Sequence, residues 1–174
     1  MGLKEATAEK HKLAERMAFN GRMFRGELSV KEYVHYLTQQ ASIFQILEQI
    51  GTPHPSLLRL KNIFEDIQEL TPKVSDKLPS LKSTEKYGIY LQKLTYEQAL
   101  PHIYLHYLAL MFGGQMMKSK VPGSGRMYDF DNMMEAAGSI RSVQKDEWVD
   151  EVNKGFDFMI EIFDELEGIH NPTK

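Results

Sequence analysis

The chain has 174 residues, of which 26% are charged, with a net charge of -3 and no cysteine. Its length suits one domain with a sizeable core. Proteins that mainly bind nucleic acid usually carry a clear basic excess, so the near balance of charge argues against that class. The absence of cysteine excludes disulfides, thiolate metal sites, iron–sulfur clusters and thiol nucleophiles, and it fits a reducing compartment.

The N-terminus predicts a soluble, cytoplasmic protein. The opening segment MGLKEATAEKHKLAERM is too charged for a secretory signal, and Ala6 stands where a myristoylation signal needs Ser or Thr. No run of about 18 apolar residues exists to span a membrane. We therefore expect neither a membrane nor a nucleic acid as a partner.

The predicted elements are helical throughout, because apolar residues recur at the 3.6-residue spacing and strand signals are almost absent. A first helix is predicted over residues 3–20. A second begins at Ser29, which forms a capping box with Glu32, and ends near residue 50. Further helices are expected over residues 56–70, 84–94, 96–121, 131–143 and 145–167, with an irregular crossing at 71–83 and a polar tail over about 168–174. Together they predict a compact, single-domain all-α bundle over residues 1–174.

Two adjacent glycines, Gly113 and Gly114, are the main irregularity of this pattern. They lie within YLALMFGGQMMKSK, residues 107–120, which otherwise favours helix. Each glycine costs about 1 kcal/mol relative to alanine inside a helix. The pair either lets two helices pack closely or lets the backbone approach a flat ligand, and Gly114 is expected to permit a kink. The residue pattern leaves both interpretations open.

Histidines are the natural ligand candidates, since helical bundles hold cofactors between facing helices. A di-iron site needs Glu-x-x-His from two helices, and the chain has only one such motif, from Glu167 to His170 at the C-terminus, where His170 is expected at the surface. His35 is expected in or beside the core. His102 and His106 share a helix face and could hold a metal, but no third ligand is evident.

His11 has a more informative setting on the first predicted helix. Thr7 and Ala14 on its face are small, which leaves room for a flat group beside the imidazole. Glu15, one turn further on, could accept a ring N–H and so fix the tautomer of a ligating histidine. Lys4, on the same face, could meet a negative group. The alternative interpretation is an exposed His–Glu pair on a charged helix.

A second wall is predicted on the helix with the paired glycines. His106, Ala109 and Gly113 share one face there, and the two small residues would let the backbone approach a planar ligand. A single histidine ligand opposite a bare helix backbone describes a five-coordinate heme with an open, tight distal pocket.

Several segments resemble the heme oxygenase family. LKEATAEKHKLAERMAF, residues 3–19, is similar to the family's first helix, whose proximal histidine follows a Leu-Lys-Glu-Ala-Thr stretch. The match continues through YVHYLTQQASIFQILE, residues 33–48. HIYLHYLALMFGGQMM, residues 102–117, resembles the distal helix, and WVDEVNKGFDFMIEIFDELE is similar to the final helix. The resemblance implies a bundle that sandwiches heme between the first helix and a glycine-kinked distal helix.

The resemblance also implies individual roles. His11 would be the axial iron ligand, Glu15 its hydrogen-bonded partner, and Gly113 the glycine over the distal heme face. The implied heme-binding residues are Lys4, His11, Glu15, Tyr104, Ala109, Gly113 and Arg141, with Lys4, Tyr104 and Arg141 directed to the heme propionates. The implied catalytic residues of the distal side are His106, Gly113 and Gly114.

The distal helix departs from the family pattern. Many bacterial and animal members carry an aspartate three residues before the paired glycines, and plant-type members carry a histidine there, whereas this chain has Leu110. Ala109 replaces a glycine, and Met111 and Phe112 replace smaller or polar residues, which predicts a drier pocket. Another group must then anchor the distal water: His106 is one candidate, and a residue from another helix is the alternative.

The function that the resemblance implies is heme oxygenase activity. Heme b would be both substrate and prosthetic group, and its oxidative opening would give biliverdin, carbon monoxide and ferrous iron. The chain has no dinucleotide fingerprint and no cysteine, so we expect no flavin, no iron–sulfur cluster and an external reductant such as ferredoxin. Lys118, Lys120 and Arg126 are candidate docking residues for an acidic donor, although a solvated charged face explains them equally. A downstream bilin reductase is a further expected partner.

Two other functions are weighed against this one. Leu110 motivates a non-enzymatic heme carrier or sensor on the same scaffold. An enzyme on the related thiamin-degrading scaffold ranks last, because the cysteine nucleophile of that family has no counterpart here.

Overall fold

The computed structural model describes residues 1–172, and these residues form an all-α fold without strands, as predicted. The helices in chain order are α1 (Leu3–Ala6), α2 (Ala8–Arg16), α3 (Ala18–Phe24), α4 (Val30–Ile50), α5 (Leu60–Leu70), α6 (Lys82–Gln92), α7 (Tyr96–Met111), α8 (Met133–Arg141) and α9 (Val149–His170). Short 3-10 helices complete the set: η1 (Pro55–Leu57), η2 (Thr71–Lys73), η3 (Gly113–Met117), η4 (Arg126–Tyr128) and η5 (Asp146–Trp148).

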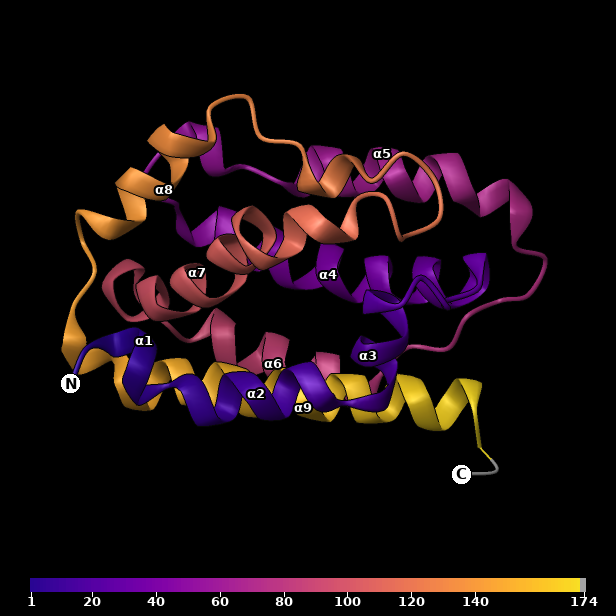
Figure 1. Cartoon of the computed structure of the whole chain (residues 1–174), viewed down its shortest axis with the longest axis horizontal. Coiled ribbons are helices and arrows are strands. Elements are labelled where there is room, and N and C mark those ends of the chain that lie inside the picture. Colours follow the sequence, from indigo (N-terminus) through magenta and orange to yellow (C-terminus); the bar gives the residue numbers. More distant parts are fainter. Residues whose placement is uncertain (173–174) are drawn as a thin grey trace.

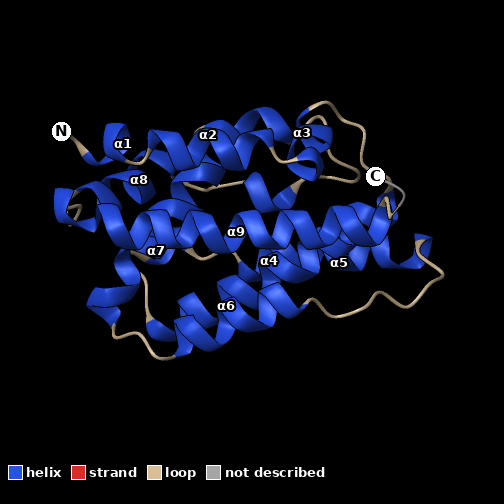
Figure 2. Ribbon diagram, turned by 90° about the horizontal axis from the view of Figure 1, so that it is seen from below, coloured by secondary structure: helices blue, strands red, loops and turns tan. Residues whose placement is uncertain are grey.

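The two long helices α4 and α9 organise the packing. Helix α4 contacts α5, α6 and α7, whereas α9 contacts α2, α3, α6 and α7. Figure 1 shows α2 and α9 along one side of the molecule, α5 and α8 along the other, and α4 and α7 between them. From below, α9 runs the length of the molecule with α2 on one side and α6 on the other (Figure 2). Helix α2 therefore belongs to the outer layer with α9, and α7 belongs to the middle layer with α4.

The start of α4 confirms the predicted capping box. The Ser29 side chain accepts a hydrogen bond from the Glu32 N–H, and the Glu32 carboxylate accepts one from the Ser29 N–H. The helix ends at Gly51, whose φ of 128° favours glycine. Both boundaries follow from local sequence.

The single first helix predicted over residues 3–20 is wrong, because the chain breaks at Thr7 and again at Met17. The Thr7 hydroxyl donates to the Leu3 carbonyl at 2.9 Å, and Met17 is extended, with φ -58° and ψ 137°. The Asn20 amide donates to the Ala14 carbonyl at 3.2 Å. That bond gives the Ala14 carbonyl a partner at the break, and the two breaks leave α2 as a short segment carrying His11.

The helix predicted over residues 96–121 also ends early. Helix α7 stops at Met111, Phe112 takes φ -104° and ψ -77°, and the chain continues as η3. The Gln115 side-chain amide donates to the Leu110 carbonyl at 3.1 Å and to the Tyr128 carbonyl at 2.6 Å. A side chain thus replaces the backbone donor that a continuing helix would have offered to Leu110.

The C-terminal helix lies further along the chain than predicted over residues 145–167, since α9 begins at Val149 and continues to His170. His170 is half-buried, not at the surface as expected, and its Nε2 lies 2.9 Å from Nδ1 of the fully buried His35. His35 Nε2 lies 2.7 Å from the Pro79 carbonyl, to which it donates. The end of the predicted polar tail, residues 173–174, lies outside the described residues. Within the described part of the chain, no helix combines the length and apolar character needed to cross a bilayer.

We expect acid to destabilise this fold below about pH 6.5, the usual histidine pKa. Burial lowers the pKa of His35, His106 and His170, so these groups stay neutral in the fold while the unfolded chain takes up protons. The free energy of unfolding should then fall by up to about 1.4 kcal/mol per pH unit for each histidine. Urea unfolding at pH 7.5 and 5.5 measures this fall, which should be smaller in His35→Gln; equal falls in both proteins would contradict it.

Candidate functional site

A cavity of about 590 Å³ lies between the N-terminal helices and the α7–η3 segment. Its size is within the range of small-molecule and cofactor sites. The lining includes each residue that the sequence singled out for heme contact or distal catalysis: Lys4, His11, Glu15, Tyr104, His106, Ala109, Gly113, Gly114 and Arg141. These residues come from α1, α2, α7, η3 and α8, so five helical elements meet at one site.

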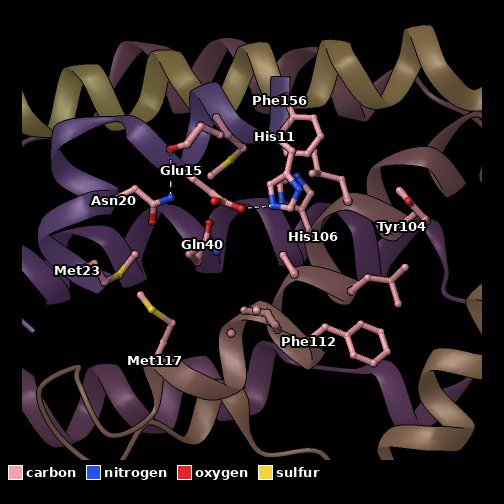
Figure 3. Close-up of a pocket in the computed structure, with 18 of the residues that line it drawn as sticks. His11, Glu15, Asn20, Met23, Gln40, Tyr104, His106, Phe112, Met117 and Phe156 are labelled. Carbon is pink, nitrogen blue, oxygen red and sulfur yellow. Dashed lines mark hydrogen bonds and ion pairs between the residues drawn. The ribbon is translucent and has the colours of Figure 1, made fainter. Parts of the chain in front are cut away.

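His11 and Glu15 form one wall of this cavity. His11 Nε2 lies 2.7 Å from Glu15 Oε1, and the imidazole stacks on Phe156 of α9 with 5.6 Å between ring centroids. The His11 side chain is 54% exposed, because the small residues Thr7 and Ala14 leave its surroundings open. Figure 3 shows the pair beside Phe156, on the opposite side of the cavity from Phe112 and Met117.

The nitrogen that faces Glu15 determines how His11 can act as a ligand. A neutral imidazole has one N–H and one bare nitrogen. When Nε2–H donates to Glu15, Nδ1 keeps the lone pair, and ligation through Nε2 instead requires the ring to turn. In either case Glu15 can accept the remaining ring N–H, which is the arrangement that raises ligand basicity.

Replacing Glu15 by glutamine is therefore expected to weaken heme binding by roughly 10-fold, because the amide is a poorer acceptor for the imidazole N–H. Titration of the heme-free protein with hemin, followed at the Soret band, measures the affinity. The band should still form, because His11 remains. A Glu15→Gln protein with unchanged affinity and an unchanged iron–histidine stretching frequency would show that this carboxylate is only a surface partner.

The paired glycines occupy two different environments on the opposite wall. A Cβ built on Gly113 would meet nothing within 4 Å, so this residue faces open space in the cavity. A Cβ on Gly114 would come within 2.7 Å of the Ala109 carbonyl and 3.1 Å of the Tyr128 ring. Neither glycine has a positive φ. Gly114 is therefore needed for close packing at the turn, whereas Gly113 leaves the cavity wall bare.

The cavity also has a polar group of residues contributed by three elements. Lys4 and Arg141 are exposed and, among the described residues, neither forms an ion pair. The Arg141 guanidinium lies 5.5 Å from the centroid of the Phe112 ring. Burial raises the pKa of Tyr104, although the positive charge of Arg141 opposes the rise. Two free cations and a phenol hydroxyl suit an anionic ligand.

The distal wall is apolar apart from His106. Leu110 is buried in the lining, and Phe112 is half-exposed beside it. His106 does not share a metal with His102, as the sequence allowed; the Tyr87 hydroxyl lies between the two imidazoles, and no group of three metal ligands occurs in the part of the chain described. Burial, with a smaller contribution from His102, lowers the pKa of His106 to about 3.

Sequence reasoning missed Gln40, a lining residue from α4. Its side chain is 4% exposed, and its Oε1 is buried without a hydrogen-bond partner. An unpaired buried amide oxygen is costly and is a common feature of binding sites that a ligand or water completes. The sequence signal was the pair of adjacent glutamines within YLTQQASIF, a helical segment that also carries Tyr, Leu, Ile and Phe.

The candidate docking cations are less available than the sequence suggested. Lys118 forms an ion pair with Asp129, and Arg126 Nη1 lies 3.1 Å from Glu69 Oε1. Lys120 is exposed and, over residues 1–172, has no acidic partner. The predicted basic surface is therefore reduced mainly to one lysine.

The fold and the cavity define a small all-α protein in which a histidine faces a bare backbone wall across a space suited to a flat, anionic ligand. The chain belongs to the heme oxygenase family, whose model matches residues 1–154. No curated protein sequence matches the chain.

Solved heme oxygenase structures are similar to this chain in fold. Heme oxygenase-1 of the cyanobacterium Synechocystis, in complex with heme, matches with a TM-score of 0.78 and 20% identity over 96% of this chain and 91% of its own. Heme oxygenase of Leptospira interrogans matches with a TM-score of 0.78 and 23% identity, covering 94% of this chain and 97% of its own. Heme oxygenase-2 of Synechocystis, in complex with heme and NO, has a TM-score of 0.76 and 20% identity over 96% and 84% of the two chains.

Proposed function

We propose that this protein is a heme oxygenase that opens heme to biliverdin and releases carbon monoxide and ferrous iron, using electrons from a separate donor. Family membership supports the class of reaction. The observation that carries the proposal is the placement of His11 and Gly113 on opposite walls of one cavity, with free cations in the same lining.

The residues of the cavity fit heme in chemical type. His11 would ligate the iron, and Glu15 would hold the imidazole through its second nitrogen. Lys4, Tyr104 and Arg141 would pair with the two propionate carboxylates. When bound, heme is the substrate and also supplies the iron at which oxygen is activated.

The contribution of the protein is to orient the ring and exclude water. The bare backbone at Gly113 leaves space for the face of a macrocycle, while Phe112 and Met117 surround it with apolar surface. Holding reacting groups in one geometry can supply a large part of a rate enhancement. Gln40, with its unpaired oxygen, would accept a hydrogen bond from water at the buried end of the cavity.

An external reductant is part of the proposal, because heme degradation consumes electrons and the chain has neither cysteine nor a dinucleotide fingerprint. We propose a ferredoxin-type donor, and a bilin reductase as consumer of the product. Lys120 is the unpaired cation nearest in sequence to η3 and is our candidate docking residue.

A heme carrier or sensor is the second candidate function, and Leu110 favours it. A buried leucine cannot hold distal water by itself, so a protein with this wall could bind heme without degrading it. The two functions differ in the fate of bound heme under reducing, aerobic conditions.

The experiment that tests the proposal is a hemin titration of the purified chain, followed by addition of a reductase, ferredoxin and NADPH in air. Catalase is included to remove free hydrogen peroxide. The Soret band should form and then disappear within minutes, while the same complex without ferredoxin keeps its band. A band that persists in both samples identifies a carrier and contradicts the oxygenase.

A further inference from the structure

A continuous chain of hydrogen-bonding side chains connects the cavity wall to the protein surface. His106 Nε2 lies 2.8 Å from the Tyr87 hydroxyl, and that hydroxyl lies 2.7 Å from His102 Nδ1. His102 Nε2 lies 2.8 Å from Glu151 Oε2. Tyr87 and His102 are fully buried, whereas His106 lines the cavity and the Glu151 side chain is 28% exposed. Each group on this route from the cavity to the surface lies within hydrogen-bonding distance of the next.

Three helices build this chain of side chains. His102 and His106 stand one turn apart on α7, so one hydroxyl from α6 can reach both. The Tyr87 ring is fixed by stacking on Phe158 of α9, with 4.5 Å between ring centroids. A Cβ on Gly155 would come 2.7 Å from Leu105 and 3.2 Å from His102 Nδ1, so this glycine allows α9 to approach α7 closely enough for the Glu151 contact.

We propose that His106, Tyr87, His102 and Glu151 form a proton relay that serves the heme side of the cavity. The inference rests on the proposed oxygenase function, because reducing oxygen takes up protons. His106 is the one imidazole or carboxylate that α7 and η3 contribute to the described lining, while Leu110 beside it is apolar.

The four groups can hold their protons in two complementary arrangements. In the resting one, His102 Nε2–H donates to the Glu151 carboxylate, the Tyr87 O–H donates to His102 Nδ1, and His106 Nε2–H donates to the Tyr87 oxygen. In the other arrangement, Glu151 has gained one proton from water, and both imidazoles carry their proton on Nδ1 instead of Nε2. The direction of every hydrogen bond is then reversed: Glu151 donates to His102, His102 to Tyr87, and Tyr87 to His106. Return to the resting arrangement moves each proton one place, releases one at His106 Nδ1 and leaves Glu151 ionised.

The charges around the relay agree with these roles. The hydrogen bond from His102 lowers the pKa of Glu151 despite the opposing effect of burial, which favours the resting carboxylate. The lowered pKa of His106 keeps its imidazole neutral, and a neutral imidazole can both accept and donate. Tyr90 donates a hydrogen bond to Glu151, and Lys154 lies 5.1 Å from the Tyr90 ring centroid. Glu151, Tyr90 and Lys154 thus form the outer, solvent-facing end of the relay.

Tyr87→Phe tests the relay, because it removes only the central hydroxyl and leaves both imidazoles in place. In the heme-free wild type, ¹⁵N NMR should show His102 and His106 each fixed with the proton on Nε2. In Tyr87→Phe the His106 signal should change toward a mixture of tautomers. With heme bound, the Soret maximum and the affinity should be unchanged, while heme consumption slows by at least about 10-fold, a threshold set below the roughly 100-fold lower end of typical proton-transfer contributions.

Tyr107→Phe is the matched control. Like Tyr87, Tyr107 is a fully buried tyrosine, but it lies on α7 and its hydroxyl donates to a carboxylate outside the relay, Glu48 at 2.9 Å. This variant should consume heme at the wild-type rate. Equal rates in Tyr87→Phe and wild type would overturn the relay alone, whereas a wild type that binds heme and never consumes it would overturn the oxygenase and the relay together.

Glu151→Gln provides a second test, because a purely structural role of Glu151 would not predict rescue of the rate by added acids. In this variant the outer end of the relay should no longer take up protons, so heme consumption should slow by about 10-fold. The rate should then recover when a small acid such as imidazolium or formic acid is added. Such acids can reach this position, because the Glu151 side chain is 28% exposed. A rate in Glu151→Gln that is low but indifferent to buffer acid would refute proton entry at this residue.

Discussion

His11→Ala is expected to weaken heme binding by on the order of 100-fold, a loss of about 2.7 kcal/mol, because the cavity offers no other exposed imidazole on the α2 wall. The spectrum of histidine-ligated heme should be lost even where heme enters the cavity. Hemin titration followed by absorbance and resonance Raman spectra measures both effects. Protein stability should change little, since the side chain is 54% exposed and packs mainly on Phe156.

Imidazole rescue separates ligation from misfolding in this variant. Free imidazole should enter the space left by His11 and restore a histidine-like spectrum, which a damaged fold would not allow. His54→Ala is the matched control, because His54 lies outside the lining and instead caps η1. A wild-type heme spectrum in His11→Ala without added imidazole would rule out His11 as the ligand.

Alanine at the two adjacent glycines should have opposite consequences. Gly114→Ala is expected to lower the free energy of unfolding by about 1–3 kcal/mol, because its methyl group would lie 2.7 Å from the Ala109 carbonyl. Gly113→Ala should leave stability unchanged, since nothing lies within 4 Å of the new methyl group. That methyl would instead occupy the ligand space and weaken heme binding by about 10- to 100-fold, equivalent to an overpacking cost of about 1–3 kcal/mol.

Gly138→Ala controls for the general effect of adding a methyl group to a helix. Gly138 lies within α8, has open space at its Cβ position and is not part of the cavity lining. Alanine there should raise stability by up to about 1 kcal/mol and leave heme affinity unchanged. Urea unfolding of the heme-free variants and hemin titration give the two quantities. The assignment fails if Gly113→Ala unfolds more easily than the wild type but binds heme normally.

Local sequence predicted most of the fold because helix starts and faces are local features. The capping box at Ser29 and Glu32 and the His11–Glu15 spacing each need only a few neighbouring residues, and the structure has both contacts. The end of α7 is different. It depends on Gln115 reaching Tyr128 across the η3–η4 turn, a contact that no 3.6-residue pattern can reveal.

The candidate site was predictable wherever one helix face carried it. His11, Glu15 and the glycine pair lie within short segments, and they meet in the same cavity. The relay residues were harder to find, because Tyr87 and Glu151 come from helices 19 and 45 residues away from His106 in sequence. A pair of histidines one turn apart indicated only a metal site, since the hydroxyl between them belongs to another helix.

Product analysis tests the central claim of ring opening most directly. The heme-loaded protein is reduced without oxygen by an excess of an external electron donor, oxygen is then admitted while donor remains, and the bilin pigment and carbon monoxide are measured together. We expect biliverdin and carbon monoxide in equal amounts, with a matching loss of heme and release of iron. Extraction of intact heme in full yield, with no carbon monoxide, would contradict it and leave a heme-binding protein on an oxygenase fold.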